Sequence, residues 1–293
     1  MEHLMDNLRA IIFMCLAMAG FALEDFIIKI IAEETPISQV LITIGCLGTV
    51  LFSIIALAVK VPIFSADILT FPVIFRSIAD LFGALFFVTA IALTPLATAS
   101  SILQATPLVV TLGAAVFLKE RVGWRRWTAS LVGFAGVLLI LRPGMAGFQP
   151  ESLFAVLGVL CLSARDLATR VMRAQLSSVT VSIYALVATA CAGVIALPFT
   201  GPFTPLQDVN WFLFAGAVLI GCFAYFTLIS ATRIGDASVV SPFRYSRLIF
   251  ALALAMGFLG ERPDSTTFIG AAIILTSGIY IFWRERVLDR KTG

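Results

Sequence analysis

The chain has 293 residues, of which 60% are hydrophobic and only 13% are charged. A soluble domain carries roughly 25% charged residues, so this chain has too few to cover a water-facing surface, and we predict that it lies in a lipid bilayer. Its formal net charge is small, at +3. Each membrane-spanning helix takes about 20 apolar residues. Ten of them would fill the chain and exclude a nucleotide-binding or catalytic domain outside the membrane.

Ten apolar stretches follow one another along the chain, separated by polar residues or by proline and glycine. They are apolar on all sides, whereas the strands of a membrane β-barrel alternate apolar and polar residues over about ten positions. We therefore predict an all-α integral membrane protein with ten transmembrane helices. The predicted helices lie at residues 8–31, 37–59, 71–92, 97–118, 125–141, 151–171, 180–200, 209–230, 237–259 and 265–284.

The Lys and Arg residues between these stretches predict the orientation, since cytoplasmic loops carry an excess of them. If the N-terminus is cytoplasmic, the inner segments hold thirteen Lys and Arg residues and the outer segments hold three, Lys29, Arg142 and Arg262. We expect both termini to be cytoplasmic, which requires an even number of helices. The acidic, mixed start MEHLMDNLR is unlike a secretory signal, so the first stretch is expected to be a retained helix.

Metal sites and disulfides are not expected. The five cysteines lie inside apolar stretches without paired spacing, and the single histidine, His3, lies in the N-terminal tail. Hydrolysis or acyl transfer in the membrane needs a nucleophile with a base, commonly histidine, or a metal, and the sequence contains no GxSxG motif. We therefore predict no catalytic residue, no metal and no cofactor, and a protein that is not an enzyme.

The two halves of the sequence resemble each other at an offset of 141 residues. FALEDFIIKII in the first span aligns with LSARDLATRVM in the sixth, so that Asp25 corresponds to Asp166. In the same alignment Lys29 corresponds to Arg170. The chain is therefore predicted to contain a repeat, although most of the remaining alignment is weak.

The second match lies near the end of each half, where FLKERV aligns with FLGERP and Glu120 corresponds to Glu261. We predict two repeats of five helices, residues 1–145 and 146–293. Because five is odd, the second repeat would cross the membrane upside down relative to the first. Inverted repeats can rock between inward-open and outward-open forms around a site near the membrane midplane, so the pattern favours a transporter.

Ionisable side chains inside the spans are the candidates for a functional site, because at bilayer depth they cost roughly 3 kcal/mol each and usually face the protein interior. The first, third, sixth and ninth spans together carry four acids and four arginines, Arg165 of the sixth among them. We expect a polar cavity between these spans. The expected substrate-binding residues are Arg76, Asp80, Gln104, Asp166, Arg244, Tyr245 and Arg247, and the expected proton-coupling or gating residues are Glu24 and Asp25.

The strongest of these candidates follow a proline. Arg244 and Arg247 come just after Pro242, which removes a helical hydrogen bond and can open the backbone locally. Guanidinium groups bind anionic and carbonyl-bearing ligands, so a ligand-binding role is favoured for both arginines. Either Glu24 or Asp25 is expected to couple protons, and the sequence does not choose between them.

Structural roles for the same charges stay open. Arg76 and Asp80 are four residues apart, so they can meet on one helix face as a permanent ion pair that touches no ligand. Asp25 and Asp166, at equivalent positions of the two halves, could instead brace the halves against each other.

Two long stretches resemble the EamA-type members of the drug/metabolite transporter superfamily. They are TPLATASSILQATPLVVTLGAAVFLKERVGWRRWTASLVGFAGVLLILRPG and VVSPFRYSRLIFALALAMGFLGERPD. In the first stretch Pro107 precedes Glu120, as in the family pattern. In the second, Leu248 takes the equivalent place and Pro242 comes earlier, so the exact shape of the ninth helix stays open. The resemblance covers essentially the whole chain and implies two repeats and ten spans.

The resemblance also implies a secondary carrier in the cytoplasmic membrane of a bacterium, with no bound cofactor. Similar members move amino acids, riboflavin-like vitamins, S-adenosylmethionine or drugs, some inward and some outward. The cavity of such proteins is lined mainly by the inner spans, which fits Arg76, Asp80, Asp166, Arg244 and Arg247.

We therefore predict a secondary-active transporter that moves a small organic metabolite across the cytoplasmic membrane by alternating access. A membrane channel or a non-transporting membrane scaffold is the alternative, although scattered paired charges are unlike the selectivity ring of a channel. The expected partners are a small-molecule substrate, the lipid bilayer and a proton as coupling ion, with no nucleic acid. The sequence leaves open whether the protein is a monomer or a homodimer.

Overall fold

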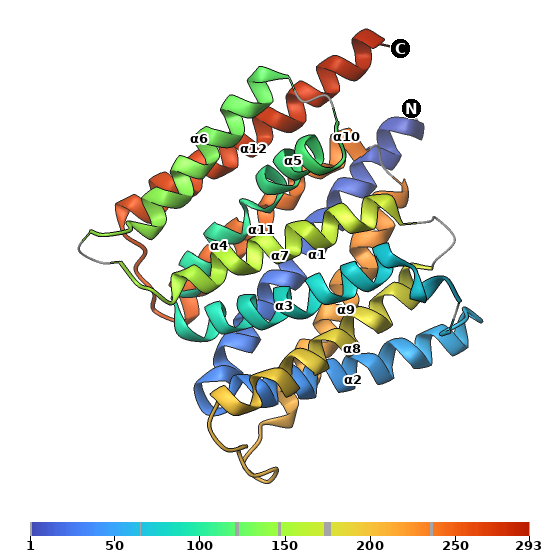
Figure 1. The fold of residues 1–293 in the computed structure, drawn as a ribbon, viewed down its shortest axis with the longest axis vertical. Helices are drawn as coiled ribbons and strands as arrows, with labels where there is room; N and C mark the ends of the chain where they lie inside the picture. The colour runs from blue at the N-terminus through green and yellow to red at the C-terminus, as the bar shows by residue number, and fades with distance from the viewer. Residues whose placement is uncertain are drawn as a thin grey trace.

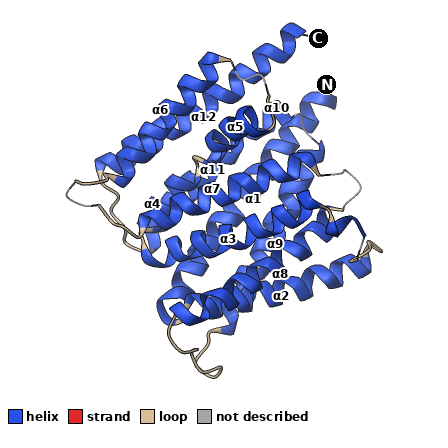
Figure 2. Ribbon diagram, viewed as in Figure 1, coloured by secondary structure: helices blue, strands red, loops and turns tan. Residues whose placement is uncertain are grey.

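The computed structural model describes residues 2–64, 66–120, 123–145, 148–172, 177–234 and 237–292. These residues form helices joined by turns and short loops, with no strand among them (Figure 2). Eight of the ten predicted spans each contain one long helix. These are α1 (Glu2–Glu34), α2 (Ile37–Ala58), α3 (Phe71–Leu93), α6 (Trp124–Leu141), α7 (Ser152–Val171), α8 (Ser178–Ala196), α9 (Trp211–Ile234) and α12 (Ser265–Thr292).

The fourth predicted span is broken in the middle into α4 (Leu96–Leu103) and α5 (Thr106–Phe117). Pro107 follows the break, and its missing N–H leaves the carbonyl of Leu103 without the usual helical donor. The hydroxyl of Thr106 donates to that carbonyl instead, at 2.6 Å. A proline inside a helix is a common cause of such a break.

The ninth predicted span is divided more finely, into α10 (Ala237–Val240), the 3-10 segment η3 (Ser241–Tyr245) and α11 (Ser246–Phe258). Pro242 lies in the first turn of η3. Its ring fixes φ and removes one donor, so the α-helix is interrupted where the sequence predicted an opened backbone. Short 3-10 helices η1 (Ala66–Leu69) and η2 (Leu197–Phe199) lie in two of the connections.

Seven helical segments of the described chain are long and apolar enough to cross a membrane. They are Met5–Glu34, Ile37–Ala58, Phe71–Leu93, Leu96–Phe117, Ser152–Val171, Ser178–Phe199 and Trp211–Thr232, and the shorter helix Ser265–Ile281 is also apolar. The prediction of an all-α membrane protein is thereby confirmed. The number of ten crossings and the inversion of the second half stay predictions.

Helices of one half pack mainly on helices of the other half. α1 lies along α9, α3 along α7, α2 along α8 and α6 along α12. In Figure 1, α2 and α8 form one side of the bundle, and α6 and α12 form the opposite side. Gly136 and Gly270 let α6 and α12 touch, since a Cβ on either glycine would lie within 2.8 Å of the other's carbonyl oxygen. Such close approach of small residues is typical of membrane helices.

The helices run between two ends of the bundle, and the connections alternate between them (Figure 1). One end holds the connection from α11 to α12, with Glu261, and is called the Glu261 end. The opposite end holds the segment after α5, with Glu120, together with both chain termini (Figure 1), and is called the Glu120 end. The placement of both termini at one end agrees with an even number of crossings.

Candidate functional site

The side chain of Arg165, on α7, lies at the centre of a charged cluster between α3 and α7. One terminal nitrogen lies 3.2 Å from Oδ1 of Asp80 on α3. The Nε and the other terminal nitrogen contact Oδ1 of Asp166, its own neighbour, at 2.9 and 2.8 Å. Although the sequence placed Arg165 inside the sixth span, it was not among the expected site residues. Its position next to Asp166, at the depth of the other charges, was the available signal.

Arg76 and Asp80 meet on one face of α3, as their spacing predicted. A terminal nitrogen of Arg76 lies 3.0 Å from Oδ2 of Asp80. The Nε of Arg76 also donates to the hydroxyl of Thr169 on α7, at 3.1 Å. Asp80 therefore lies between two arginines, Arg76 and Arg165, in a side chain that is 9% exposed.

Arg244 belongs to η3 and differs from the other arginines of the site. Its side chain is exposed, and within the described residues it makes neither a hydrogen bond nor an ion pair. It lies within electrostatic range of Asp166, which attracts it, and of Arg165, which repels it.

Arg247 of α11 is paired with Asp25 of α1. Its Nε and one terminal nitrogen lie 3.2 and 2.6 Å from Oδ2 of Asp25, which is 4% exposed. The guanidinium also lies over the rings of Phe21 and Phe87, at 5.4 and 6.0 Å from their centroids. Such stacking favours a cation in a desolvated place. The pair joins α1 and α11 across the two halves, as a bracing role for Asp25 requires.

Glu24 is the neighbour of Asp25 on α1, but it faces α9. A Cβ added to Gly221 of α9 would lie 2.6 Å from Oε1 of Glu24, so the carboxyl group rests directly on the backbone of α9. Within the described residues it has no hydrogen bond and no ion pair. The sequence did not choose between these two acids, and the structure distinguishes them: Asp25 is in an ion pair, whereas Glu24 has none among the described residues.

Gln104 and Tyr245 lie at the breaks of the fourth and ninth spans. Gln104 follows α4 directly and is 7% exposed, and Tyr245 ends η3 and is 4% exposed. The hydroxyl of Tyr245 packs against Gly278 of α12, where an added Cβ would overlap it. Tyr245 therefore points toward α12. A ligand-binding role for Gln104 and Tyr245 stays a prediction.

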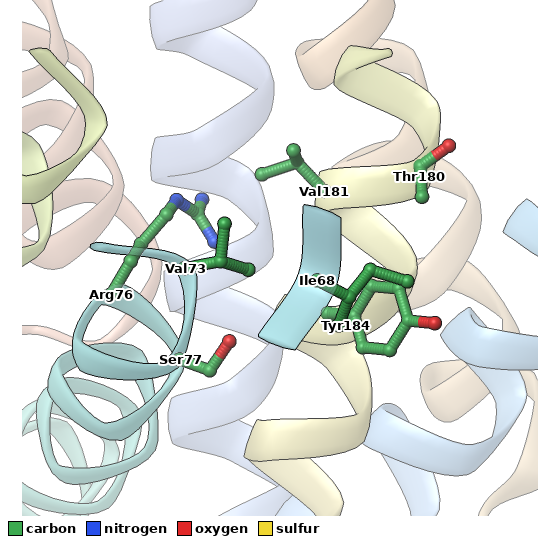
Figure 3. A pocket seen from close by; sticks show the side chains of 7 residues that line it. All are labelled: Ile68, Val73, Arg76, Ser77, Thr180, Val181 and Tyr184. Carbon is green, nitrogen blue, oxygen red and sulfur yellow. The ribbon is translucent and has the colours of Figure 1, made fainter. Parts of the chain in front are cut away.

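A small recess lies beside Arg76, between α3, η1 and α8 (Figure 3). Its volume is about 10 Å³, which is room for about one water molecule and far below the roughly 300 Å³ of a small-molecule pocket. It is lined by Ile68, Val73, Arg76, Ser77, Thr180, Val181 and Tyr184. The recess is too small to hold a metabolite.

The Glu261 end is closed by contacts between the two halves. The two carboxylate oxygens of Glu261 accept hydrogen bonds from the backbone N–H groups of Leu96 and Ala97, at 2.6 and 3.0 Å. These donors are at the N-terminus of α4, where a helix has free N–H groups and favours a negative charge. Glu261 therefore caps a helix of the first half.

Lys29 of α1 reinforces this end. Its ammonium group donates to the carbonyls of Ala92 and Thr94 at the end of α3, at 3.1 and 2.9 Å. A cation is favourable at the C-terminus of a helix. Lys29 and Glu261 also attract each other. We call these contacts of Lys29 and Glu261 the Glu261 latch.

The Glu120 end carries the equivalent residues. Glu120 and Arg170 form an ion pair with a distance of 3.5 Å, and both side chains are about half exposed, at 48% and 51%. This pair is called the Glu120 latch. It joins the end of α5 to α7, and it is longer and more open to solvent than the contacts of the Glu261 latch.

The two latch glutamates follow the same backbone turn. The N–H of Glu120 donates to the carbonyl of Ala114 at 3.2 Å, and the N–H of Glu261 donates to that of Ala255 at 3.0 Å. The preceding residue has a left-handed backbone in both cases, with φ of 55° and 64°. This is the Schellman ending of a helix. The sequence match between FLKERV and FLGERP thus has a matching local structure.

The chain belongs to the EamA-like transporter family, whose model matches it twice, at residues 8–142 and 149–283. The two matches begin 141 residues apart, which is the offset at which the two halves were aligned. Family and fold therefore define a membrane transporter protein with two EamA-like domains, and the predicted membership of the drug/metabolite transporter superfamily is confirmed.

Several curated relatives are transporters. An S-adenosylmethionine uptake transporter of Rickettsia bellii is 28% identical over 216 residues, which is 73% of this chain and 72% of that protein. A riboflavin transporter of Rhizobium johnstonii is 30% identical over 217 residues, or 74% and 71% of the two chains. A pseudopaline exporter of Pseudomonas aeruginosa is 25% identical over 272 residues, or 90% and 92%.

One solved crystal structure has the same fold, with a TM-score of 0.63 and 21% identity. It covers 96% of this chain and 98% of its own. The likeness concerns the arrangement of helices. The names of the relatives indicate transport of small molecules in bacterial membranes, and none of those three names is that of an enzyme.

Proposed function

We propose that the protein is a secondary-active transporter that moves a small organic metabolite across the cytoplasmic membrane of a bacterium by alternating access. The observation that carries this proposal is the exchange of equivalent charges between the halves. Lys29 of the first half attracts Glu261 of the second, while Arg170 of the second half pairs with Glu120 of the first. One latch lies at each end of the bundle, so each can close one side of a central site.

The packing of the helices supports an inverted repeat, residues 1–145 and 146–293. If the halves are related by a two-fold axis in the membrane plane, the contact of α1 with α9 must have a partner in the contact of α7 with α3. Both contacts are present. Helices α2 and α8, and helices α6 and α12, must then pair with each other, as they do. Similar bundles of opposite orientation have two forms of comparable energy.

The difference between the latches supports a conformation closed at the Glu261 end. That end has two hydrogen bonds from helix N–H groups to Glu261 that join the two halves, and two more from Lys29 to the end of α3 within the first half. The Glu120 latch, in contrast, is a half-exposed ion pair. Charge-assisted hydrogen bonds are stronger than exposed ion pairs. With the orientation predicted by the basic loops, the Glu261 end faces outward and the Glu120 end, with both termini, faces the cytoplasm.

A proton is the proposed coupling ion, and Glu24 is its proposed carrier. Asp25 is already paired with Arg247, so it can stay ionised through the cycle. Glu24 rests on the backbone of α9 and makes neither a hydrogen bond nor an ion pair among the described residues, while Arg247 binds Asp25 instead. An unpaired carboxylate at membrane depth is so costly that the group favours the protonated form. Opening of the α1–α9 contact to water would release that proton.

Counterflow in proteoliposomes tests the proposal. The purified protein is reconstituted with unlabelled S-adenosylmethionine or riboflavin inside, and the uptake of the same labelled compound is followed. A carrier gives a transient overshoot that saturates with concentration. A flux that rises linearly with concentration would indicate a channel, and no flux above empty liposomes for either compound or for a panel of amino acids would indicate a scaffold. Liposomes without protein are the control.

A further inference from the structure

The pair of helices α2 and α8 is tied together at the Glu261 end. The amide of Gln39, near the start of α2, accepts a hydrogen bond from the backbone N–H of Thr204 at 2.8 Å and donates one to its carbonyl at 3.0 Å. The hydroxyl of Thr204 donates to the carbonyl of Glu34 at 2.9 Å, and that of Thr200 donates to the hydroxyl of Ser38 at 2.5 Å. Both threonines lie in the connection from α8 to α9. We call these contacts the Thr204 strap.

The opposite end of the same pair carries a second tie. The hydroxyl of Thr180, near the start of α8, donates to the carbonyl of Pro62 at 2.8 Å. The hydroxyl of Tyr184 donates to the carbonyl of Ile63 at 3.1 Å. Pro62 and Ile63 follow α2 in the connection to α3, which lies at the Glu120 end (Figure 1). We call these contacts the Pro62 strap.

The two straps are equivalent under the offset of 141 residues between the halves. Gln39 corresponds to Thr180, and Ile63 corresponds to Thr204. Each strap therefore joins the start of one helix of the pair to the connection that follows the other helix. The two latches differ between the two ends of the bundle, whereas both straps are formed in the same conformation. The contact of α2 with α8 is thus closed at both ends at once.

The two helices are also in close contact between the straps. A Cβ added to Gly45 of α2 would lie 2.5 Å from the backbone nitrogen of Ala190 on α8, and such close approach of small residues is typical of membrane helices. Phe52 and Ala56 of α2 pack with Ile183 of α8 in one buried cluster. Separation of the pair at either end would therefore break a strap and expose packed backbone.

The α6–α12 pair, on the opposite side of the bundle (Figure 1), is fastened differently. Arg142 after α6 forms an ion pair with Asp264 before α12, at the Glu261 end. The equivalent positions at the Glu120 end hold Trp283 and Gly123, which cannot form an ion pair. The ion pair of α6 and α12 thus has no equivalent at the Glu120 end, and its asymmetry follows that of the latches.

We propose that the α2–α8 pair stays closed throughout the transport cycle and is the hinge about which the two halves move. This inference rests on the proposed alternating access and adds the place about which it turns. Displacement about a hinge grows with distance from it, so the halves separate at the latches and farthest along α6 and α12. A two-fold operation that exchanges α2 and α8 leaves the pair in place. One hinge therefore serves the inward-open and the outward-open forms alike.

Cross-linking of the straps tests the hinge, in a chain whose five native cysteines are replaced. Two variants are made, Gln39→Cys with Thr204→Cys and Thr180→Cys with Pro62→Cys, and each pair is bridged by a short bifunctional thiol reagent. Counterflow of S-adenosylmethionine and of riboflavin is measured before and after bridging. Because a hinge does not open, bridging is expected to change the rate by less than about twofold.

A bridge across the Glu261 latch is the matched comparison. Ala97→Cys with Glu261→Cys, bridged by the same reagent, is expected to lower counterflow about tenfold or more, because the Glu261 end can no longer open. A loss of the same size after bridging of either strap would overturn the hinge, since it would show that α2 and α8 must separate during transport.

Distances between spin labels test the hinge without a substrate. Glu34→Cys with Gly201→Cys places two labels beside the Thr204 strap, and Leu93→Cys with Arg262→Cys places two beside the Glu261 latch. When Glu261→Gln is added to open that end, the distance beside the latch is expected to lengthen while the distance beside the strap stays the same. Lengthening of the distance beside the strap would overturn the hinge.

The outcomes separate this inference from the proposed function. Absence of counterflow for every compound in the unbridged protein would contradict transport, while the spin-label distances would still decide for or against a closed α2–α8 pair. Normal counterflow that is lost when a strap is bridged would overturn the hinge and leave the transporter intact.

Discussion

Glu261 caps Leu96 across the two halves of the chain: its carboxylate accepts a hydrogen bond of 2.6 Å from a backbone N–H 165 positions earlier. The segment after α11 is thereby fixed to the N-terminus of α4. A helix cap supplied from elsewhere in the fold holds only while the two elements stay together. The contact can therefore work as a latch, since it is lost in full when α4 and α11 separate at this end.

Glu261→Gln is expected to open the Glu261 end. Glutamine keeps one acceptor but loses the charge, which removes the attraction to Lys29 and weakens the cap on α4. Loss of charge-assisted hydrogen bonds of this kind costs about 1–3 kcal/mol, and 1.4 kcal/mol changes a population tenfold. With the native cysteines replaced, a cysteine at Thr98 in α4 should react several-fold faster with a membrane-impermeant maleimide.

Glu120→Gln is the matched variant at the opposite end. Because the Glu120 latch is half exposed, its loss should change labelling at Thr98 by less than twofold. A labelling rate at Thr98 that is the same in Glu261→Gln as in the parent protein would contradict a closing role for the Glu261 latch.

Glu24→Gln is expected to remove the pH dependence of net uptake while counterflow exchange continues. Exchange needs no net proton movement, whereas uphill uptake does, so the two assays separate coupling from binding. Asp25→Asn should act differently, because it leaves Arg247 buried without its partner and lowers the yield of folded protein. A Glu24→Gln protein that still accumulates substrate against a gradient when a proton gradient is applied would contradict the coupling role.

Much of the fold could be predicted from the sequence. Apolar stretches of the length of a membrane placed the helices, since the segments containing α2 and α3 end within one residue of their predicted limits. Pro107 and Pro242 marked the two breaks. The pairing of helices between the halves was beyond the sequence, because apolar stretches of similar composition pack on one another without a distinguishing pattern.

The candidate site was predicted in part. Burial of charge at bilayer depth indicated the spans whose charged residues the structure pairs, and the i,i+4 spacing predicted the contact of Arg76 with Asp80. The partners across helices were not predictable, because they depend on tertiary packing. Arg247 is paired with Asp25, and Arg165 contacts both Asp80 and Asp166. The sequence showed the latch residues only as equivalent positions of the two halves. Their contacts could be identified only in the structure.

Arg165→Ala is expected to destabilise the protein more than the loss of a surface arginine. It removes the shared partner of Asp80 and Asp166, and leaving a largely buried carboxylate with fewer partners costs about 1–3 kcal/mol. Arg9→Ala, whose pair with Asp6 is exposed, should cost less than about 1 kcal/mol. Thermal unfolding of both variants in detergent makes the comparison. Equal melting temperatures would mean that Arg165 contributes nothing to the packing of α3 on α7.

The inverted repeat predicts opposite locations for two equivalent residues. Single cysteines at Lys119 and Gly260, which share the left-handed turn before the latch glutamates, should be labelled from opposite sides of the membrane in intact cells and in inverted vesicles. Gly260 is expected to face the periplasm and Lys119 the cytoplasm, since the basic loops predict a cytoplasmic N-terminus. Labelling of both cysteines from the same side would contradict the inversion and, with it, two latches on opposite sides.

Asp264 gives a pH-dependent contribution to the stability of α12. A hydrogen bond from the backbone N–H of Thr267, followed by the hydroxyls of Thr267 and Thr266 and the charge of Arg142, lowers the pKa of Asp264 to about 2. Because the folded-state pKa lies below the ordinary value of about 4, this stabilisation is complete above about pH 4 and is lost as the pH falls toward 2.

Asp264→Ala, which removes the helix cap, should cost about 0.5–2 kcal/mol at neutral pH. Asp264→Asn keeps a capping oxygen, so its melting temperature should approach that of wild type at pH 2. A constant difference between Asp264→Asn and wild type from pH 6 to pH 2 would show that the charge of Asp264 does not stabilise α12.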